Sequence, residues 1–360
     1  MNNENKKIFE DVKLKIAISN FEKEEKETMK YNRKNILKVV AVACCILILT
    51  TGGVFAKDIT NFIKNLFGAN TSGGVDTAVN NGYIADVETE YQNADGIEIK
   101  IDTILMDDFN FDINFNVKLS DNYSFEDFDG NMEFEDLKVV DENGEIVFIT
   151  HPYDKNLDYK GAYSFLPQKI TDKEFKVSFS ATGSTETFPR SKHLTIEFTK
   201  IIKSEFVNSK MTSKTYEGNW KFEIDVAEEF YNRKSTIYTV KKCNFDNINV
   251  TKAILSNTAF KIELITDTNT ISYEKPNTED LIVIGDYIAL KDEYVETSNG
   301  KKFEPARKSD GDGGYGISKD NIIQYYQTFN LTSYDATDDI TVHIFTNNGE
   351  EIIIELERNK

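Results

Sequence analysis

The sequence is poor in the residues that build disulfides, zinc sites and rigid turns. Its 360 residues include three cysteines, three histidines, five prolines and one tryptophan. Cys44 and Cys45 lie within an apolar run, so Cys243 is the only cysteine in the rest of the chain, and no intramolecular disulfide is available there. We therefore expect the stability of that region to come from packed apolar cores.

The sequence also lacks the motifs of the common catalytic sites. It contains no metalloprotease helix, GxSxG elbow, Walker loop or CxxC pair. His151, His193 and His343 have no Glu, Cys or Ser at a spacing typical of a catalytic or metal site. Residues 310–314 resemble the start of a calcium loop but lack its third acidic ligand and its closing glutamate, which favours a flexible turn. We expect no enzymatic activity, no metal and no cofactor.

Basic residues are fewer than acidic ones, 42 against 61, which gives a formal net charge of −19. A surface of this sign repels the phosphates of nucleic acids, so we expect no nucleic-acid partner. Clusters of carboxylates such as Glu126, Asp127 and Asp129 are typical of a solvated surface in so acidic a chain. The 39% of hydrophobic and 12% of aromatic residues suffice for packed cores, and the length suits two domains.

One segment is apolar enough to cross a membrane. Residues 36–56 carry Lys38 as their only charge, and about twenty helical residues span the roughly 30 Å hydrocarbon core of a bilayer. This predicts a transmembrane helix over residues 36–56, with the lipid bilayer as its partner. The positive-inside rule then predicts that residues 1–35 are cytoplasmic and the rest of this single-pass protein is extracytoplasmic. The cations that set this topology are Lys30, Arg33, Lys34 and Lys38.

Two alternatives to a permanent anchor are open at this stage. Val54-Phe55-Ala56 resembles a signal-peptidase site, and cleavage after Ala56 would release a secreted protein, such as a secreted enzyme. The charged leader of about 35 residues is longer than that of an ordinary signal peptide, which favours an uncleaved anchor. Lipidation of Cys44 or Cys45 is the second alternative, but both residues lie early in the apolar run and suit a helix as small apolar side chains.

Amphipathic patterns flank the apolar segment. Residues 4–27 have a helical pattern in which Phe9, Val12 and Ile16 share one face. This face either binds a cytoplasmic partner or belongs to a solvated stalk. Residues 69–82 are small and polar, which predicts a flexible linker. Residues 57–68 predict a juxtamembrane helix whose apolar face consists of Ile59, Phe62, Ile63, Leu66 and Phe67.

From residue 83 onward, apolar and polar residues alternate with period two. In the stretch 109–117 every second residue is apolar, which predicts a half-buried strand. Trp220 belongs to such a pattern and is expected in a core. Strands that recur every 8–12 residues indicate a mainly β fold of two antiparallel sandwiches. We place these domains at 83–203 and 204–360, with the boundary in the polar stretch 203–219. Further strands are predicted at 97–101, 134–140, 145–150, 174–180, 193–203, 219–227, 236–241, 245–255, 258–265, 281–289, 322–331, 340–346 and 351–356.

Three sequence stretches resemble a known family. DITNFIKNLF after the apolar segment, NADGIEIKIDTILMDDFNFDINFNVKL and later EGNWKFEIDV occur in the order found in the Gram-positive bacterial membrane proteins catalogued as domain of unknown function 4179. The resemblance implies immunoglobulin-like sheets outside the membrane on a single anchor. It also implies a partnership with extracytoplasmic-function sigma factors.

These observations favour a membrane-anchored envelope regulator of the anti-sigma type. In this interpretation the outer domains sense an envelope ligand, which the sequence does not identify, and residues 1–35 contact a regulatory partner such as a sigma factor. The alternative is a cell-surface binding or adhesion module without catalytic activity, because sandwich domains commonly present loops to ligands.

Overall fold

The computed structural model describes residues 72–359 apart from Glu88 and the stretches 151–160, 184–186, 208–209, 268–292, 307–312, 318–321 and 346–350. The predicted segments 1–35, 36–56 and 57–68 lie outside these residues, as does the predicted strand 281–289. Within the described residues, no helix has the length and apolar character that crossing a bilayer requires. All described residues belong to one compact unit, Lys57–Lys360.

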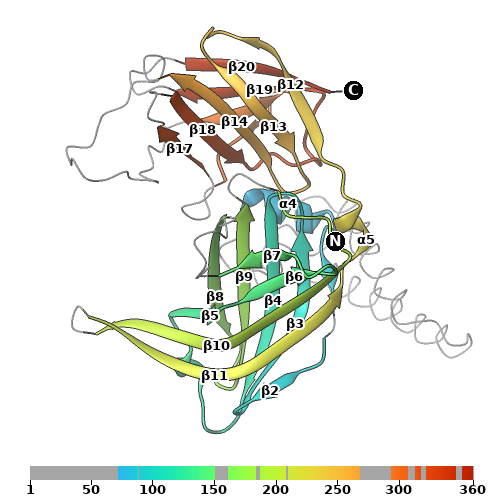
Figure 1. The fold of residues 1–360 in the computed structure, drawn as a ribbon. Coiled ribbons are helices and arrows are strands. Elements are labelled where there is room, and N and C mark those ends of the chain that lie inside the picture. Colours follow the sequence, from blue (N-terminus) through green and yellow to red (C-terminus); the bar gives the residue numbers. More distant parts are fainter. Residues whose placement is uncertain are drawn as a thin grey trace, which may run out of the picture. The chain divides into compact units, whose positions relative to one another are not determined.

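The described chain is mainly β and contains three antiparallel sheets (Figure 1), as the period-two pattern predicts. The first β region, residues 85–225, holds two of these sheets. One has the order β1-β3-β4-β9-β8, with β2 beside β3. Its strands are β1 (Ala85–Asp86), β2 (Gln92–Ala94), β3 (Ile97–Met106), β4 (Asn110–Leu119), β8 (Gly161–Lys169) and β9 (Glu174–Gly183).

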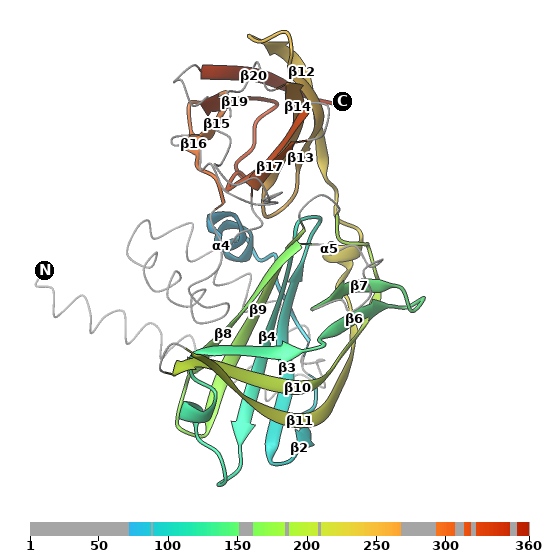
Figure 2. The same ribbon diagram turned by 60° about the vertical axis from the view of Figure 1, so that its left-hand side comes forward.

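The other sheet of the first β region has the order β11-β10-β6-β7, and β5 pairs with a separate part of β10. Figure 2 shows β10 and β11 crossing β3, β4 and β9 of the first sheet. The strands are β5 (Asn131–Glu135), β6 (Lys138–Asp141), β7 (Ile146–Ile149), β10 (His193–Val207) and β11 (Lys210–Asp225).

Aromatic side chains fill the space between these two sheets. The ring of Phe115 on β4 lies 5.0 Å from that of Phe134 on β5 and 6.1 Å from that of Phe198 on β10, both edge to face. Trp220 on β11 is fully buried and stacks on Phe198 at 5.2 Å. This confirms the prediction that Trp220 is a core residue. The two sheets of the first β region therefore enclose one shared core.

The second β region, residues 236–358, is one nine-stranded sheet in the order β16-β15-β19-β20-β12-β13-β14-β18-β17. Residues 236–237 of β12 pair with β13, whereas residues 238–243 pair with β20. Both halves bury apolar residues in one core. The strands are β12 (Thr236–Cys243), β13 (Asn249–Leu255), β14 (Phe260–Asp267), β15 (Tyr294–Thr297), β16 (Lys302–Phe303), β17 (Gly313–Ile317), β18 (Ile322–Phe329), β19 (Asp339–Phe345) and β20 (Glu351–Arg358).

The expected flexible linker 69–82 instead contains a packed helix. Helix α4 spans Gly73–Asn80, and the hydroxyl of Ser72 caps it by accepting a hydrogen bond from the Val75 N–H. Val75, Ala78 and Val79 are buried in the core of the first β region. Small polar residues suggested a linker, but these three apolar side chains share a helix face that packing makes stable. The two other described helices are η2 (Phe125–Asp127) and α5 (Glu228–Tyr231).

The predicted domain boundary at 203/204 falls inside β10 and is corrected by the structure. β10 and β11 pair from Val207 and Lys210 as far as His193 and Asp225, so the polar stretch forms the arms of a hairpin. Its polar residues lie on exposed strands, where they resemble a linker in sequence. The two cores are instead separated between Tyr231 and Tyr238.

The polar face of β4 also differs from the half-buried strand predicted for it. Asn110, Asp112 and Asn114 are buried, as are Phe111 and Ile113 between them. The Asn114 side chain donates to the Thr103 hydroxyl at 2.9 Å and accepts from the Ser178 hydroxyl at 2.8 Å. Hydrogen bonds of this kind allow polar groups to be buried.

The turn predicted at residues 94–96 is present. Asp95 and Gly96 adopt φ values of +50° and +79°, as the connection between β2 and β3 requires. A Cβ atom on Gly96 would lie 2.3 Å from the Ser120 hydroxyl oxygen. Glycine at this position is therefore required both by the backbone conformation and by close packing.

Candidate functional site

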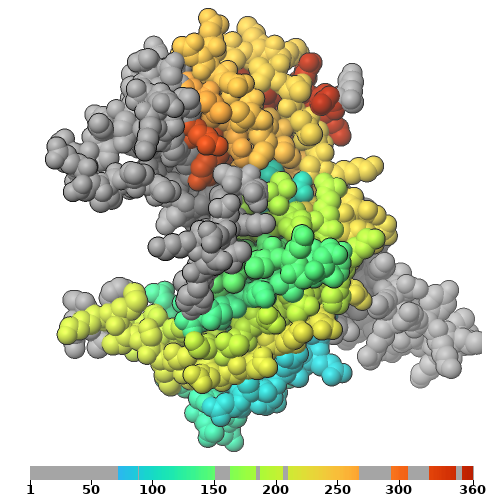
Figure 3. All heavy atoms as spheres, viewed as in Figure 1, coloured from blue at the N-terminus to red at the C-terminus, as the bar shows by residue number. Residues whose placement is uncertain are grey.

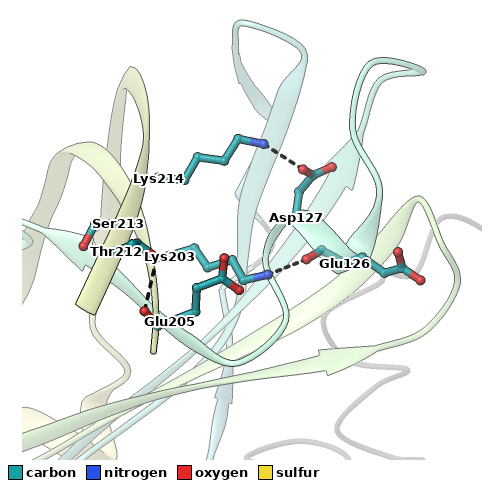
Figure 4. Close-up of a pocket in the computed structure, with 7 residues that line it drawn as sticks. All are labelled: Glu126, Asp127, Lys203, Glu205, Thr212, Ser213 and Lys214. Carbon is teal, nitrogen blue, oxygen red and sulfur yellow. Dashed lines mark hydrogen bonds and ion pairs between the residues drawn. The ribbon is translucent and has the colours of Figure 1, made fainter. Parts of the chain in front are cut away.

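A groove between η2 and the β10–β11 hairpin is the candidate functional site (Figure 4). Its volume is about 340 Å³. Charged and hydroxyl side chains line it: Glu126, Asp127, Lys203, Glu205, Thr212, Ser213 and Lys214. Such lining suits a polar ligand rather than an apolar one.

Asp127 fixes one wall of the groove. Its carboxylate accepts the Ser124 N–H at 2.9 Å, which closes the start of η2, and pairs with the Lys214 ammonium at 2.7 Å. Lys214 and this N–H hold the pKa of Asp127 below its ordinary value because both stabilise the carboxylate form. The Asp127 side chain is 28% exposed and that of Lys214 is 58% exposed, so the pair positions the wall without being deeply buried.

Tyr216 supports the same wall through contacts with Asp127 and Lys214. Its hydroxyl donates to the Asp127 carbonyl at 3.0 Å, and the Lys214 ammonium lies 4.8 Å from the centre of its ring. Burial raises the pKa of Tyr216, and Asp127 raises the pKa of Lys214. At neutral pH the groove therefore keeps a charged carboxylate, a charged ammonium and a neutral phenol.

The opposite wall is the hairpin itself. The Lys203 ammonium donates to the Glu126 carbonyl at 2.7 Å, and the Thr212 hydroxyl donates to the Glu205 carbonyl at 3.3 Å. Both lysines of the groove are thus engaged, whereas the carboxylates of Glu126 and Glu205 form no ion pair among the described residues. This set of groups can recognise a polar or cationic ligand, and it contains no paired nucleophile and base.

A second polar cluster joins the two β regions. The Asp107 carboxylate, in the turn between β3 and β4, accepts the Thr258 N–H at 2.9 Å and its hydroxyl at 2.5 Å. The Asn110 side chain donates to the same Thr258 hydroxyl at 2.6 Å. All three residues are buried. We call Asp107, Asn110, Thr258 and Arg233 together the junction.

Arg233 closes the junction from the connection between α5 and β12. Its guanidinium donates to the Asp108 carboxylate at 2.7 Å and to the Phe230 carbonyl at 2.6 Å, and also bonds the Phe188 and Pro189 carbonyls. The side chains of Arg233 and Asp108 are 2% and 7% exposed. A buried arginine with this many acceptors is a structural clamp.

The site residues predicted from sequence all lie outside the residues that the structure describes. They comprise the topology-setting cations, the face of Phe9, Val12 and Ile16, and the apolar face of 57–68. His193 faces Asp225 at 3.1 Å, whereas His343 faces Glu351 at 2.7 Å and stacks on Tyr294. Among the described residues, no group of three or more His, Cys, Asp or Glu side chains is arranged to hold a metal ion.

Sequence reasoning missed the groove and the junction. Glu126 and Asp127 were interpreted as solvated surface, and the stretch 203–219 as a domain boundary. The alternation of Thr212, Lys214 and Tyr216 along the strand was the available signal, because residues two apart share a face. The junction residues carry no local pattern.

Comparisons with known proteins assign no family. No family model matches the chain, and no curated protein matches it. Among solved structures it is similar to the conserved domain protein from Bacillus anthracis, with 12% sequence identity and a TM-score of 0.41. That match covers 82% of this chain and 93% of the other. A likeness this distant carries no functional conclusion, and the resemblance to domain of unknown function 4179 stays a prediction.

Proposed function

We propose that the chain is a membrane-anchored envelope regulator of the anti-sigma type. Its extracytoplasmic region, two immunoglobulin-like sandwiches, senses an envelope ligand, and residues 1–35 contact a cytoplasmic regulatory partner such as a sigma factor. The apolar segment 36–56, with cations at its N-terminal end, supports a single-pass topology. The resemblance to domain of unknown function 4179 supports the same assignment. The proposal gives the chain no catalytic activity.

The structural observation behind the proposal is the packing of α4, the first described helix after the predicted anchor. Val75, Ala78 and Val79 are buried in the first β region. At the N-terminal end of the helix, the Gly74 N–H donates to the Asn330 side chain at 3.2 Å. A Cβ atom on Gly74 would lie 1.9 Å from the Thr258 carbonyl. The helix therefore touches both β regions at the junction.

This packing provides a mechanism by which ligand binding to the β regions would reach the predicted membrane anchor. A ligand shifts a conformational equilibrium only when it binds one state better than the other. A ligand that changes how the two β regions meet would alter the surface on which α4 rests. The chain between residue 56 and α4 would then carry that change toward the anchor.

The first test is cytoplasmic. We expect the full-length chain, purified from membranes, to retain a sigma-type transcription factor. The double variant Phe9→Asp with Val12→Asp should lose that factor, because both carboxylates disrupt the same apolar face. Asn2→Asp with Asn3→Asp adds the same charge away from the face and should retain it. If the wild-type chain retains no transcription factor, the regulator proposal is wrong.

The second test addresses α4. Gly74→Ala forces the helix away from the Thr258 carbonyl and should change the transcripts that depend on the full-length protein. Gly73→Ala is the matched control, since its new Cβ would meet only the Asn330 side chain at 3.3 Å. Equal transcript profiles for the two variants would show that α4 does not carry the signal.

A second candidate function is a cell-surface binding or adhesion module. The groove and the exposed arm of β11 favour it, because both present polar groups to a ligand. Deletion of residues 1–29 separates the two proposals. An adhesion module keeps its binding to cell-envelope fractions after this deletion, and transcripts do not change.

A further inference from the structure

The outer edge of β11 is available for another strand. β11 ends its sheet, and β10 is its sole strand partner within the described ranges. All six residues from Lys210 to Thr215 are exposed, and Figure 3 shows the β10–β11 hairpin at the molecular surface in yellow-green and yellow. An edge strand presents main-chain N–H and C=O groups that an incoming extended chain can pair with.

Further along β11, the side-chain amide of Gln92 is hydrogen-bonded to the same outer edge. The Lys221 N–H donates to the Gln92 side-chain oxygen at 2.7 Å, and the Gln92 side-chain nitrogen donates to the Lys221 carbonyl. A side-chain amide carries the same donor and acceptor as a peptide bond. Gln92 therefore covers this edge as one residue of a neighbouring strand would. β2 ends at Ala94, and no described strand covers residues 210–215.

The groove lies on one face of this open edge. Thr212 and Lys214, which line it, alternate with Met211, which is 61% exposed. Side chains of an added strand also alternate between the two faces. One set would enter the groove, and the other would lie beside Met211.

The charges of the groove select the side chains that enter it. Lys203 and Lys214 are held by the Glu126 carbonyl and by Asp127. The Glu205 carboxylate remains for a ligand, whereas Figure 4 shows the Glu126 carboxylate turned away from both lysines. The net charge of −19 attracts a cationic partner and repels a second copy of this chain.

We propose that the β11 edge from Lys210 to Thr215 binds an extended peptide in which cationic and apolar residues alternate. The peptide adds a strand to the sheet, directs its cationic side chains toward Glu205 in the groove, and packs its apolar side chains beside Met211. This inference is independent of the membrane topology and of any cytoplasmic partner.

The test uses the full-length chain in detergent and a fluorescent eight-residue peptide of alternating lysine and valine, followed by anisotropy at low salt. We expect saturable binding. A peptide of alternating glutamate and valine should bind at least tenfold more weakly. So should a lysine–valine peptide methylated on alternate backbone nitrogens, because it cannot complete the ladder.

Variants of the chain locate the site. Glu205→Gln should weaken binding severalfold, whereas Glu229→Gln, an exposed substitution on α5, should not. Thr212→Pro and Ser213→Pro should weaken peptide binding to different extents. Successive N–H groups along a strand point to opposite edges, so only one of the two prolines removes an N–H from the open edge. Trp220 fluorescence checks that each variant folds.

Three outcomes would overturn the proposal. The first is no binding of the lysine–valine peptide, and the second is equal binding of its N-methylated form. The third is a concentration-dependent dimer, seen by sedimentation and abolished by one of the two proline variants, which would assign this edge to a second copy of the chain.

Discussion

The Asp107 carboxylate in the β3–β4 turn holds the Thr258 N–H and hydroxyl of the β13–β14 turn, at 2.9 and 2.5 Å. Its other oxygen accepts the N–H groups of Phe109 and Asn110 at 2.8 and 2.9 Å. One buried carboxylate thus shapes its own turn and fixes the neighbouring β region. A carboxylate with this many hydrogen bonds is costly to remove, because its donors would be left buried without an acceptor.

We expect Asp107→Ala to lower the free energy of unfolding by about 4 kcal/mol or more, because four buried donors lose their acceptor and each costs about 1 kcal/mol or more. Chemical denaturation measures this loss. Amide hydrogen exchange should rise at residues 256–259 as well as at 107–110. Asp225→Ala removes an exposed aspartate and should have little effect. Faster exchange confined to 107–110 would argue against coupling through Thr258.

Arg233 is the second clamp of the junction. Arg233→Met should lower the free energy of unfolding by about 3–5 kcal/mol, because it leaves the buried Asp108 carboxylate without its main partner. Arg233→Lys should recover little of this loss, since an ammonium cannot reach the separate acceptors that the guanidinium fork binds.

A double-mutant cycle checks the Arg233 prediction by denaturation. The combination of Arg233→Met with Asp108→Asn should cost less than the sum of the two single changes. Additive losses would mean that the two side chains stabilise the fold independently.

Gly218 makes room for Trp220. A Cβ atom on Gly218 would lie 2.2 Å from the indole ring, so Gly218→Ala should destabilise the chain by about 1–3 kcal/mol through overpacking. Trp220 is the only tryptophan, and its fluorescence reports both unfolding and the displacement of the ring. Asn219→Ala, at an exposed neighbouring position, is the control and should leave the spectrum unchanged. An unshifted spectrum in Gly218→Ala would contradict this packing.

Acid should weaken the groove through Asp127. Its folded-state pKa is lowered from the ordinary 3.8, so its contribution to stability is fully present above about pH 3.8 and is lost as the pH falls through the lowered value. Lys214→Gln should raise the pKa of Asp127 toward 3.8, which carboxyl ¹³C NMR titration measures. Lys203→Gln, whose ammonium bonds a carbonyl instead, should leave it unchanged. If Lys214→Gln does not move the pKa, the Ser124 N–H alone is responsible for the shift.

Alternation in the sequence was sufficient to place most of the strands. β4, β9, β10, β12, β14, β19 and β20 coincide closely with predicted stretches, whereas β3 continues beyond its predicted stretch 97–101 to Met106. Residues 322–329 form a strand, as their aromatic content suggested. β8 was missed because Pro167 and the small residues near its start break the apolar alternation. The short strands β1 and β16 offer too few residues for a period to be recognised.

By itself the sequence determined the mainly β class, the burial of Trp220 and the glycine turn at 94–96, because each depends on neighbours within a few positions. Only the tertiary structure decided that Asp107 meets Thr258 and that Asp127 meets Lys214. Those pairs are far apart in the chain, and any of the many acidic residues would satisfy the local pattern equally well. Strand order and sheet packing select the partners, because they bring distant turns together in the folded chain.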